Sequence, residues 1–304
     1  MAFYIGLEIK YFVSPNYKME DLLIYEIDEH DVEHDMHKLM TTDGVLAGLT
    51  TIKHYMFNHI CNVKVYSKGT FPQKYVSFYD VHMDIDRLMR EYLYISKAVV
   101  GAMERRPKRP FKYHVYEMFR LYYGTVSVFK PSIAKRLVET FKPSCVLDPC
   151  AGWGSRMLGC IAGGCDTYIG FDTNMNLELV YQKMIAELGF ERKARIIMDD
   201  CAKVNYEDYN YDMILTSPPY YNTEVYPFST IMSKEQWNEW YLFVIEKWWR
   251  GLHVGGVMAL ALPFSVYHLA VHVSGDCDDC WRLNNVKRCV DKMDTELLFI
   301  WVKK

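Results

Sequence analysis

The 304-residue sequence lacks an apolar run of the roughly 20 residues that a membrane-spanning helix needs. Its N-terminus also lacks the basic region, apolar core and cleavage site of a secretory leader. It has little net charge, because 35 basic residues nearly balance 38 acidic ones. Charge alone therefore predicts no nucleic-acid partner. We expect a soluble intracellular protein without a membrane partner, and its 50% apolar content is ample for a core.

The sequence also lacks a disulfide framework. Its nine cysteines are an odd number without regular spacing, so we expect reduced thiols. One group of potential zinc ligands near the C-terminus comprises His268, His272, Cys277, Cys280 and Cys289. A single Cys-x-x-Cys with irregular histidine spacing is a weak zinc signal. We predict no metal site there, and instead a helix followed by an acidic turn.

A glycine-containing loop is the first informative motif. Asp148-Pro149-Cys150-Ala151-Gly152-Trp153-Gly154 follows the apolar run 145–147, a predicted buried strand, and precedes a predicted helix that starts near residue 156. Glycines at such a turn leave room for a ligand and adopt backbone angles that other residues avoid. Taken alone, the loop is equally compatible with a plain structural turn.

The elements that follow repeat the same strand-to-helix order. Residues 167–171 predict a second strand, which ends in Asp172, a candidate acceptor for ribose hydroxyls. After a predicted helix over 176–188, residues 194–198 predict a third strand. It is followed by Asp199 and Asp200, where a carboxylate could accept from an adenine amino group.

A fourth predicted strand, residues 212–215, leads into Ser217-Pro218-Pro219-Tyr220. Ligands of open α/β sheets gather at the carboxyl edge of the strands, so both loops should meet there. Together the two motifs resemble those of the S-adenosylmethionine-dependent DNA amino-methyltransferases. That family pairs an Asp-Pro-x-x-Gly-x-Gly loop with an (Asp/Asn/Ser)-Pro-Pro-(Tyr/Phe/Trp) loop, and the resemblance covers about residues 115–304.

This resemblance implies an α/β fold of the Rossmann-like class I methyltransferase type, with a mostly parallel sheet flanked by helices. It implies S-adenosylmethionine as cofactor and DNA as partner, with one base extruded from the duplex. The methyl group would pass by direct in-line displacement to N4 of cytosine or N6 of adenine, and serine at the first acceptor position is commoner among the cytosine enzymes. RNA as the substrate is the alternative, as is an inactive cofactor-binding partner subunit.

The resemblance also implies residue roles. The catalytic set is Ser217, Pro218, Pro219 and Tyr220, in which the serine side chain and the first proline's carbonyl accept the amino hydrogens and the tyrosine stacks on the base. The cofactor-binding set is Phe129, Pro131, Asp148, Pro149, Gly152, Gly154, Asp172 and Asp200. Phe129 and Pro131 also fit a simpler interpretation, a proline at a helix start beside an aromatic anchor.

Methylation of a ring carbon is excluded by the same comparison, because its cysteine nucleophile follows a proline in the acceptor loop. Here the Pro-Cys pair, Pro149-Cys150, lies in the cofactor loop. A glutamine side-chain amide is disfavoured as acceptor, since those enzymes carry asparagine where this chain has Ser217.

The rest of the chain completes the predicted architecture. Ser233 and Gln236 form a capping-box pattern before a helix over 234–251, and residues 257–262 and 296–302 predict two further strands. We assign residues 111–304 to the methyltransferase domain. Residues 1–110 are expected to form an α+β module for recognition or partner binding, with strands near 63–66 and 76–78 and a helix over 85–103.

Positive charge is concentrated in one stretch. The stretch from Glu104 to Arg136 contains nine Lys/Arg and two Glu, which gives a local net charge of +7. The predicted nucleic-acid-binding residues are Arg105, Arg106, Lys108, Arg109 and, next to the acceptor loop, Tyr221. Prolines in the densest part predict an exposed linker that holds a phosphate backbone or, alternatively, serves as a solvated interdomain hinge.

Overall fold

The computed structural model describes residues 27–66, 75–122, 126–221, 224–225, 232–283 and 296–304. The chain forms two compact units. The sheet unit comprises Ile27–Tyr55, Val128–Tyr221 and Thr230–Lys304; the helical unit includes Met56–Ser127 and Asn222–Ser229. In the part of the chain that the structure describes, no helix has both the length and the apolar character to cross a membrane.

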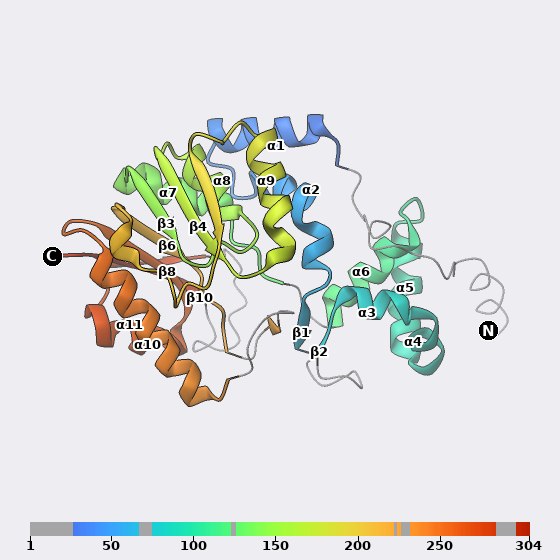
Figure 1. The fold of residues 1–304 in the computed structure, drawn as a ribbon. Coiled ribbons are helices and arrows are strands. Elements are labelled where there is room, and N and C mark those ends of the chain that lie inside the picture. The colour runs from blue at the N-terminus through green and yellow to red at the C-terminus, as the bar shows by residue number, and fades with distance from the viewer. Residues whose placement is uncertain (1–26, 67–74, 123–125, 222–223, 226–231, 284–295) are drawn as a thin grey trace. The chain divides into compact units, whose positions relative to one another are not determined.

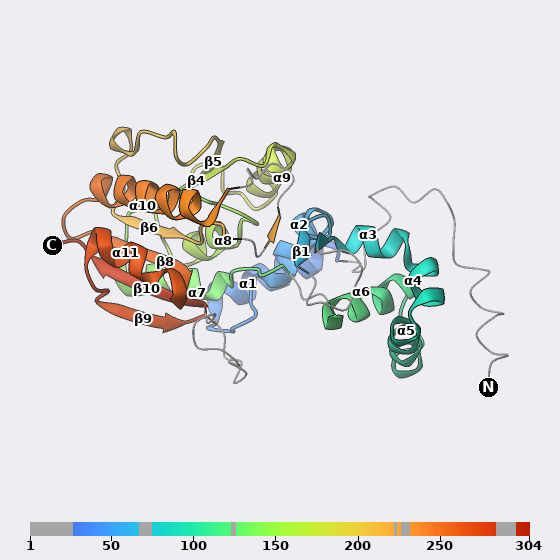
Figure 2. The ribbon, with the colours of Figure 1, turned by 90° about the horizontal axis from the view of Figure 1, so that it is seen from below.

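The sheet unit is built on a seven-stranded sheet of order β5-β4-β3-β6-β8-β10-β9 (Figure 1). Its strands are β3 (Cys145–Asp148), β4 (Thr167–Asp172), β5 (Ala194–Met198), β6 (Met213–Thr216), β8 (Val257–Pro263), β9 (Asp279–Arg282) and β10 (Glu296–Val302). The first five strands in this order are parallel, whereas β10 is antiparallel to β8 and β9. Figure 2 shows β9 and β10 at the end of the sheet away from β5. This is the arrangement of class I methyltransferases, so the predicted fold class is confirmed.

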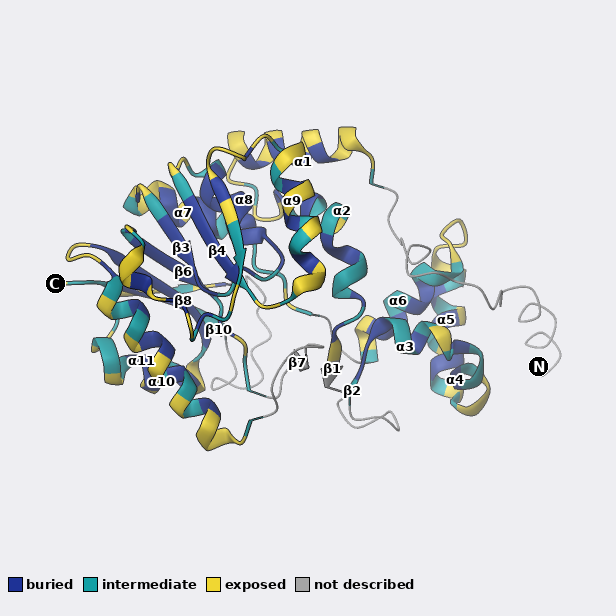
Figure 3. Ribbon diagram, viewed as in Figure 1, coloured by how far each residue is buried: buried dark blue, intermediate teal, exposed yellow. Residues whose placement is uncertain are grey.

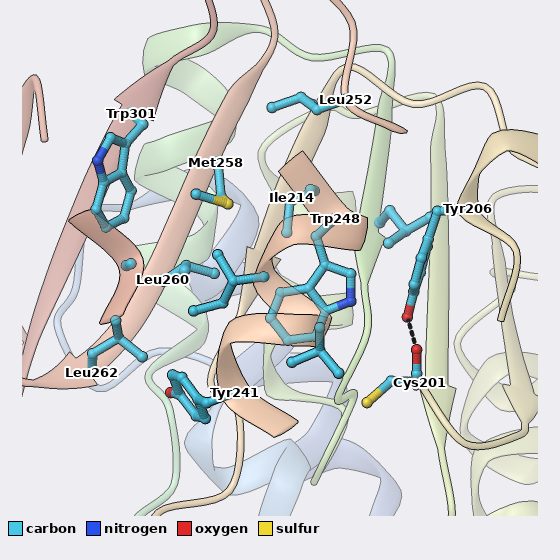
Figure 4. Close-up of a cluster of buried hydrophobic side chains, with 14 of the residues drawn as sticks. Cys201, Tyr206, Ile214, Tyr241, Trp248, Leu252, Met258, Leu260, Leu262 and Trp301 are labelled. Carbon is cyan, nitrogen blue, oxygen red and sulfur yellow. Dashed lines mark hydrogen bonds between the residues drawn. The ribbon is translucent and has the colours of Figure 1, made fainter. Parts of the chain in front are cut away.

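One face of the sheet packs on the helices α10 (Lys234–Gly251) and α11 (Tyr267–Ser274). Side chains alternate along a strand, so Leu147 and Ile214 face this core while their neighbours face the other side. Trp248 of α10 is fully buried among them, as Figure 4 shows. The capping box predicted at the start of α10 is present, with Ser233 accepting from the backbone of Gln236.

The helices α7 (Pro131–Phe141) and α8 (Ser155–Ala162) pack closely against each other, and α8 also contacts β4. The two helices approach so closely that a Cβ on Gly159 would lie 2.1 Å from the carbonyl oxygen of Pro131. The helix α9 (Glu178–Glu187) contacts β5, and short 3-10 turns at Met175–Leu177, Tyr206–Asp208 and Phe264–Val266 connect elements of the sheet unit. The strands between these helices are largely buried (Figure 3).

Residues 27–55 belong to the sheet unit, although the predicted boundary was placed at residue 110. They contain α1 (Glu29–Thr41) and the start of α2 (Leu49–Ile60). Buried Asp35 accepts hydrogen bonds from the backbone of Gly48 at 3.0 Å and of Thr51 at 2.8 Å, which fixes the turn between the helices. Lys135 of α7 donates to the Thr42 carbonyl at 3.0 Å. This attachment depends on contacts far apart in sequence, which composition does not reveal.

The helical unit contains α3 (Phe78–Met83), α4 (Ile85–Glu91), α5 (Leu93–Arg105) and α6 (Phe111–Tyr122). A small antiparallel sheet of order β2-β1-β7 joins β1 (Lys64–Tyr66), β2 (Tyr75–Val76) and β7 (Glu224–Val225). Two expectations need correction. The strand near 76–78 ends at Val76 because Ser77 caps α3, and the helix over 85–103 is broken at Tyr92, whose backbone is extended.

Candidate active site

Four neighbouring parallel strands deliver the predicted site residues to one edge of the sheet. The glycine loop follows β3, Asp172 ends β4, Asp200 lies just after β5, and Ser217 follows β6. Since β5, β4, β3 and β6 are adjacent and parallel, their carboxyl ends share an edge. The fold therefore brings together groups that are up to about 70 residues apart in the sequence.

Asp148 anchors the glycine loop from beneath. Its carboxylate is fully buried and accepts from Arg156 Nε at 2.7 Å and from the Tyr168 hydroxyl at 2.6 Å. Burial and the neighbouring Asp148 charge raise the pKa of Tyr168, which keeps this hydroxyl a donor. Asp148 was predicted to bind cofactor, but in the structure it holds the loop and exposes no surface. Pro149, which follows it, is also buried.

The glycine loop itself has the backbone conformation that only glycine adopts easily. Gly152 and Gly154 have φ values of +62° and +73°. The Gly152 amide donates to Asp172 Oδ2 at 2.8 Å, and the Tyr181 hydroxyl bonds both the Gly152 carbonyl and, at 3.2 Å, the same carboxylate. The loop is thus tied to the end of β4 before any ligand binds.

Asp172 keeps acceptor capacity for a ligand. Its Oδ1 receives the Asn174 amide at 2.9 Å, which leaves this oxygen a further lone pair. Burial raises the pKa of Asp172 despite these hydrogen bonds, so additional donors would stabilise the carboxylate. An acceptor at the end of β4 beside a side-chain-free loop fits the ribose of a nucleoside cofactor. The predicted cofactor, S-adenosylmethionine, fits this arrangement.

Asp200 shapes the turn after β5. Its Oδ1 accepts from the Ala202 amide at 2.9 Å, and its other oxygen lies 3.7 Å from the exposed ammonium of Lys203. The carboxylate is only partly buried and remains accessible to a donor.

Phe129 and Pro131 have separate positions. The Arg156 guanidinium lies 5.4 Å from the centre of the Phe129 ring, so this ring covers the buried ion pair. Pro131 is the first residue of α7 and is buried against Gly48 and Gly159. The position of Pro131 thus matches the simpler interpretation of a proline that starts a helix.

The acceptor loop is held by the hydroxyl of Tyr220. This hydroxyl lies 3.1 Å from Ser217 Oγ and 3.1 Å from the Ala261 carbonyl, and it also bonds Glu296. Burial and the Glu296 charge raise the pKa of Tyr220 well above its usual value, so it remains protonated. Pro218 is buried, whereas Pro219 is exposed.

Glu296 is a candidate site residue that was not predicted from the sequence. It begins β10 and pairs with Pro263, the last residue of β8. Because β10 runs antiparallel to β8, its first residue lies at the carboxyl edge of the parallel strands. Burial raises the pKa of Glu296, although Tyr220 and Arg156 oppose this shift. The sequence feature that could have indicated this residue is a glutamate at the start of an otherwise apolar strand.

The predicted nucleic-acid-binding residues lie in two places. Tyr221 packs beside Trp237 of α10, with ring centres 6.0 Å apart. Residues 105–109 form the end of α5 and the exposed connection to α6, within the helical unit, and therefore do not form an interdomain hinge. Arg106 donates to the Tyr113 hydroxyl at 2.6 Å, and Arg109 lies 5.0 Å from the centre of the same ring. Arg105 and Arg106 also pair with Glu117 at 3.6 and 3.9 Å.

The described residues include no cluster of three or more potential metal ligands. His268 and His272 lie on α11, and Cys280 lies on β9, a strand where an acidic turn was expected. Cys289 falls outside the described residues.

A family model described as conserved hypothetical protein 95 matches residues 125–249, and no curated protein matches. Similar solved structures include TrmN from Thermus thermophilus, with 18% identity over 57% of this chain and a TM-score of 0.40; this chain spans about half of TrmN, 49%. The M. jannaschii tRNA m1G37 methyltransferase is 16% identical over 57% of this chain and 49% of that one, with a TM-score of 0.38. A TehB-like SAM-dependent methyltransferase from Corynebacterium glutamicum is 14% identical over 59% of this chain and 90% of that one, with a TM-score of 0.41.

The predicted membership of the DNA amino-methyltransferase family is wrong. The family model that matches residues 125–249 is described as conserved hypothetical protein 95 and is not that of the DNA amino-methyltransferases. The physical reason is that a clamp on a planar amino group is needed wherever that group occurs. An acceptor loop of this type would therefore not identify the molecule that carries the amine.

The ion pair beneath the glycine loop generates the first prediction. Arg156→Met leaves the buried Asp148 carboxylate without its cation, and we expect a loss of about 3–5 kcal/mol in the free energy of unfolding. A double variant, Asp148→Asn with Arg156→Met, should recover a large part of this loss, because no charge then remains buried. Urea unfolding measures both. Lys203→Met, which removes an exposed partner of Asp200, is the control and should change stability by less than about 1 kcal/mol. Equal losses in all three variants would contradict this interpretation.

The raised pKa of Asp172 generates a pH prediction. Ribose hydroxyls that donate to the carboxylate lower this pKa on binding, so affinity for S-adenosylmethionine should be constant above the raised pKa and fall as pH drops through it. The fall in affinity should begin at a pH above the ordinary pKa range of an aspartate. In Asp172→Asn the affinity should be weaker and lose this pH dependence. Calorimetric titration across pH checks both proteins, and a pH-independent wild type would remove Asp172 from cofactor binding.

Proposed function

We propose that this protein transfers a methyl group from S-adenosylmethionine to an exocyclic amino group of a base in RNA. The observation that carries this proposal is the Ser217-Pro218-Pro219-Tyr220 loop at the carboxyl end of β6, one strand away from the glycine loop after β3. A methyl donor on one loop and an amine on the other would meet at the same edge of the sheet.

The acceptor loop suits a poor nucleophile. The lone pair of an exocyclic amine is delocalised into the ring, and two acceptors that bind both amino hydrogens favour a tetrahedral nitrogen. Ser217 Oγ and the Pro218 carbonyl would be these acceptors. Consecutive prolines restrict the backbone and remove competing N–H donors, which favours a fixed carbonyl direction. The exposed ring of Pro219 adds apolar surface beside the amine.

The residues at β3, β4 and β5 would hold the cofactor. The side-chain-free turn at Gly152 and Gly154 leaves backbone room, Asp172 would accept the ribose hydroxyls, and Asp200 would accept from the adenine amino group. When bound, S-adenosylmethionine supplies an electrophilic methyl group. Asp148 and Phe129 act indirectly in this proposal, because they fix and cover the Arg156 side chain under the loop.

The basic segment favours RNA as the polymer. Single-stranded nucleic acid is bound by cations that follow the backbone and by aromatic or guanidinium planes on which bases stack. Arg106 and Arg109 lie in the exposed connection between α5 and α6 and pack beside the half-buried ring of Tyr113 on α6, which combines both kinds of group. RNA loops also present unstacked bases, so their amino groups are reachable without opening a duplex.

The proposal is tested by supplying the purified protein with S-adenosylmethionine and, separately, structured RNA and duplex DNA of mixed sequence. The products are digested to nucleosides and identified by mass spectrometry. N-methylated nucleosides from RNA alone are the expected result, and their identity names the base. Methylation of DNA alone, or of neither polymer despite cofactor binding shown by calorimetry, would overturn the proposal.

Ser217→Ala removes one acceptor from the amine while leaving the cofactor pocket intact. We expect kcat on the RNA substrate to fall by about 10- to 100-fold, because the hydrogen bond from the amine to Ser217 strengthens as the nitrogen becomes tetrahedral. Affinity for S-adenosylmethionine should stay within about twofold of wild type, as calorimetry can measure. Ser274→Ala on α11 is the matched control and should keep wild-type turnover. An unchanged kcat in Ser217→Ala would exclude this serine from the mechanism.

Arg106→Gln with Arg109→Gln should weaken binding of an unstructured RNA oligonucleotide and lower the slope of log affinity against log salt by about 1 to 2. The reason is that a variant with fewer cations neutralises fewer phosphates and therefore releases fewer counterions on binding. Fluorescence anisotropy over a range of salt concentrations gives both values. Arg90→Gln, an exposed arginine on α4, is the charge-matched control. Identical slopes in the double variant and the control would exclude the segment as a phosphate site.

A further inference from the structure

The proposed reaction leaves a proton that must go somewhere. When the amine nitrogen forms its bond to the methyl carbon, the carbon–sulfur bond breaks and its electron pair goes to sulfur. The product nitrogen then carries a positive charge until it loses a hydrogen. The acceptor loop offers only a serine hydroxyl and a proline carbonyl, and neither keeps a proton at neutral pH. A base connected to them would assist the removal of this proton.

Glu296 is such a base, connected to Ser217 by one side chain. The Tyr220 hydroxyl bonds a Glu296 carboxylate oxygen and lies 3.1 Å from Ser217 Oγ. The three groups come from two distant parts of the chain, the loop after β6 and the first residue of β10. The Ala261 carbonyl lies 3.1 Å from the same hydroxyl and is a second, uncharged acceptor for the phenolic hydrogen, which the anionic carboxylate attracts more strongly.

The direction of these hydrogen bonds sets the polarity of Ser217. An ionised carboxylate only accepts, so Tyr220 donates its single hydrogen toward Glu296. The phenolic oxygen then presents lone pairs to Ser217, which donates its own hydrogen to Tyr220. The lone pairs of Ser217 Oγ are left to accept an amino hydrogen. The carboxylate thereby orients a serine that it does not touch.

We propose that Glu296 is the positioning residue that orients Ser217 through Tyr220 and takes up the proton that the methylated amine releases. The proton moves from nitrogen to Ser217 Oγ, the serine hydrogen moves to Tyr220, and the phenolic hydrogen moves to the carboxylate. One proton leaves the amine, one reaches Glu296, and both hydroxyls end as they began. This inference rests on the proposed function, because it requires an amine in the acceptor loop.

The surroundings of Glu296 suit this role. Burial raises the pKa of the carboxyl above that of an exposed glutamate, which makes it a better proton acceptor near neutrality. The charged and titratable groups that act on it are Arg156 of α8 and Tyr220 of the acceptor loop, both of which lower its pKa. Tyr241 of α10, also close enough to be affected by Glu296, is held neutral by burial.

The pH dependence follows from this arrangement. As pH falls through the raised pKa, Glu296 takes a proton and no longer accepts one, so kcat should fall on an acidic limb that begins above the ordinary glutamate range. Rates are measured at saturating S-adenosylmethionine, which removes the contribution of Asp172 to cofactor binding. In Glu296→Gln we expect kcat to fall roughly 100-fold and the acidic limb to disappear, while KM for RNA and cofactor affinity change little.

Tyr220→Phe breaks the same connection at its middle and should lower kcat similarly. Glu296→Asp restores an ionisable group and should recover part of the rate. Glu239→Gln, an exposed glutamate on α10, is the matched control and should behave as wild type. The infrared band of the protonated Glu296 carboxyl can be titrated in the wild type, and its loss in Glu296→Gln assigns the band. This measurement gives the protonation state of the group without requiring turnover.

The outcomes separate the two proposals. A wild-type protein without turnover on RNA would overturn the proposed function and this inference with it. A wild type active on RNA, with a Glu296→Gln variant that keeps the rate and the acidic limb, would overturn the inference alone. So would an infrared titration that places the Glu296 carboxyl in the ordinary range. Loss of the limb with cofactor affinity retained would support it.

Discussion

The buried ion pair between Asp148 and Arg156 is the interaction on which the site depends. It fixes the loop after β3, and Phe129 covers it from one side. The same guanidinium charge reaches the acceptor loop, where it lowers the pKa of Tyr220 and of Glu296. One buried cation therefore influences both the loop proposed for the methyl donor and the network proposed for the amine. The guanidinium also donates to the Cys150 carbonyl, so the ion pair and this bond together hold the loop after β3 in place.

The sequence predicted the sheet well because buried parallel strands are short apolar runs and their turns are marked by glycine and proline. β3, β4, β5, β8 and β10 lie within a residue or so of their expected positions. The sequence could not place Glu296, because its position depends on the antiparallel register of β10 against β8. Nor could it attach residues 27–55 to the sheet unit, since the hydrogen bonds from Lys135 to Thr42 and from Ser132 to Val45 join segments that no local pattern connects.

The error about the family has a related cause. In the proposed reaction, the loop Ser217-Pro218-Pro219-Tyr220 would meet one geometric requirement, which is two acceptors on one planar nitrogen. Selection for that need acts in the same way on any polymer that bears an amino group. What would differ between polymers is the surface that holds them, which we propose includes the arginines beside Tyr113, and such a surface has no fixed sequence pattern. A few loop residues can therefore predict the type of reaction, whereas the substrate must be identified from the fold and by experiment.

The order of strands has a consequence for synthesis of the chain. β10 lies between β8 and β9, although both are made before it, and in the described sheet β9 pairs only with β10. During translation neither the far end of the sheet nor the Glu296 carboxylate can take its place until β10 has left the ribosome. The glycine loop and its neighbours on β4 and β5 can assemble much earlier, because their contacts are closer in sequence. A nascent chain would thus be able to form its nucleoside pocket before it has the means to complete the transfer.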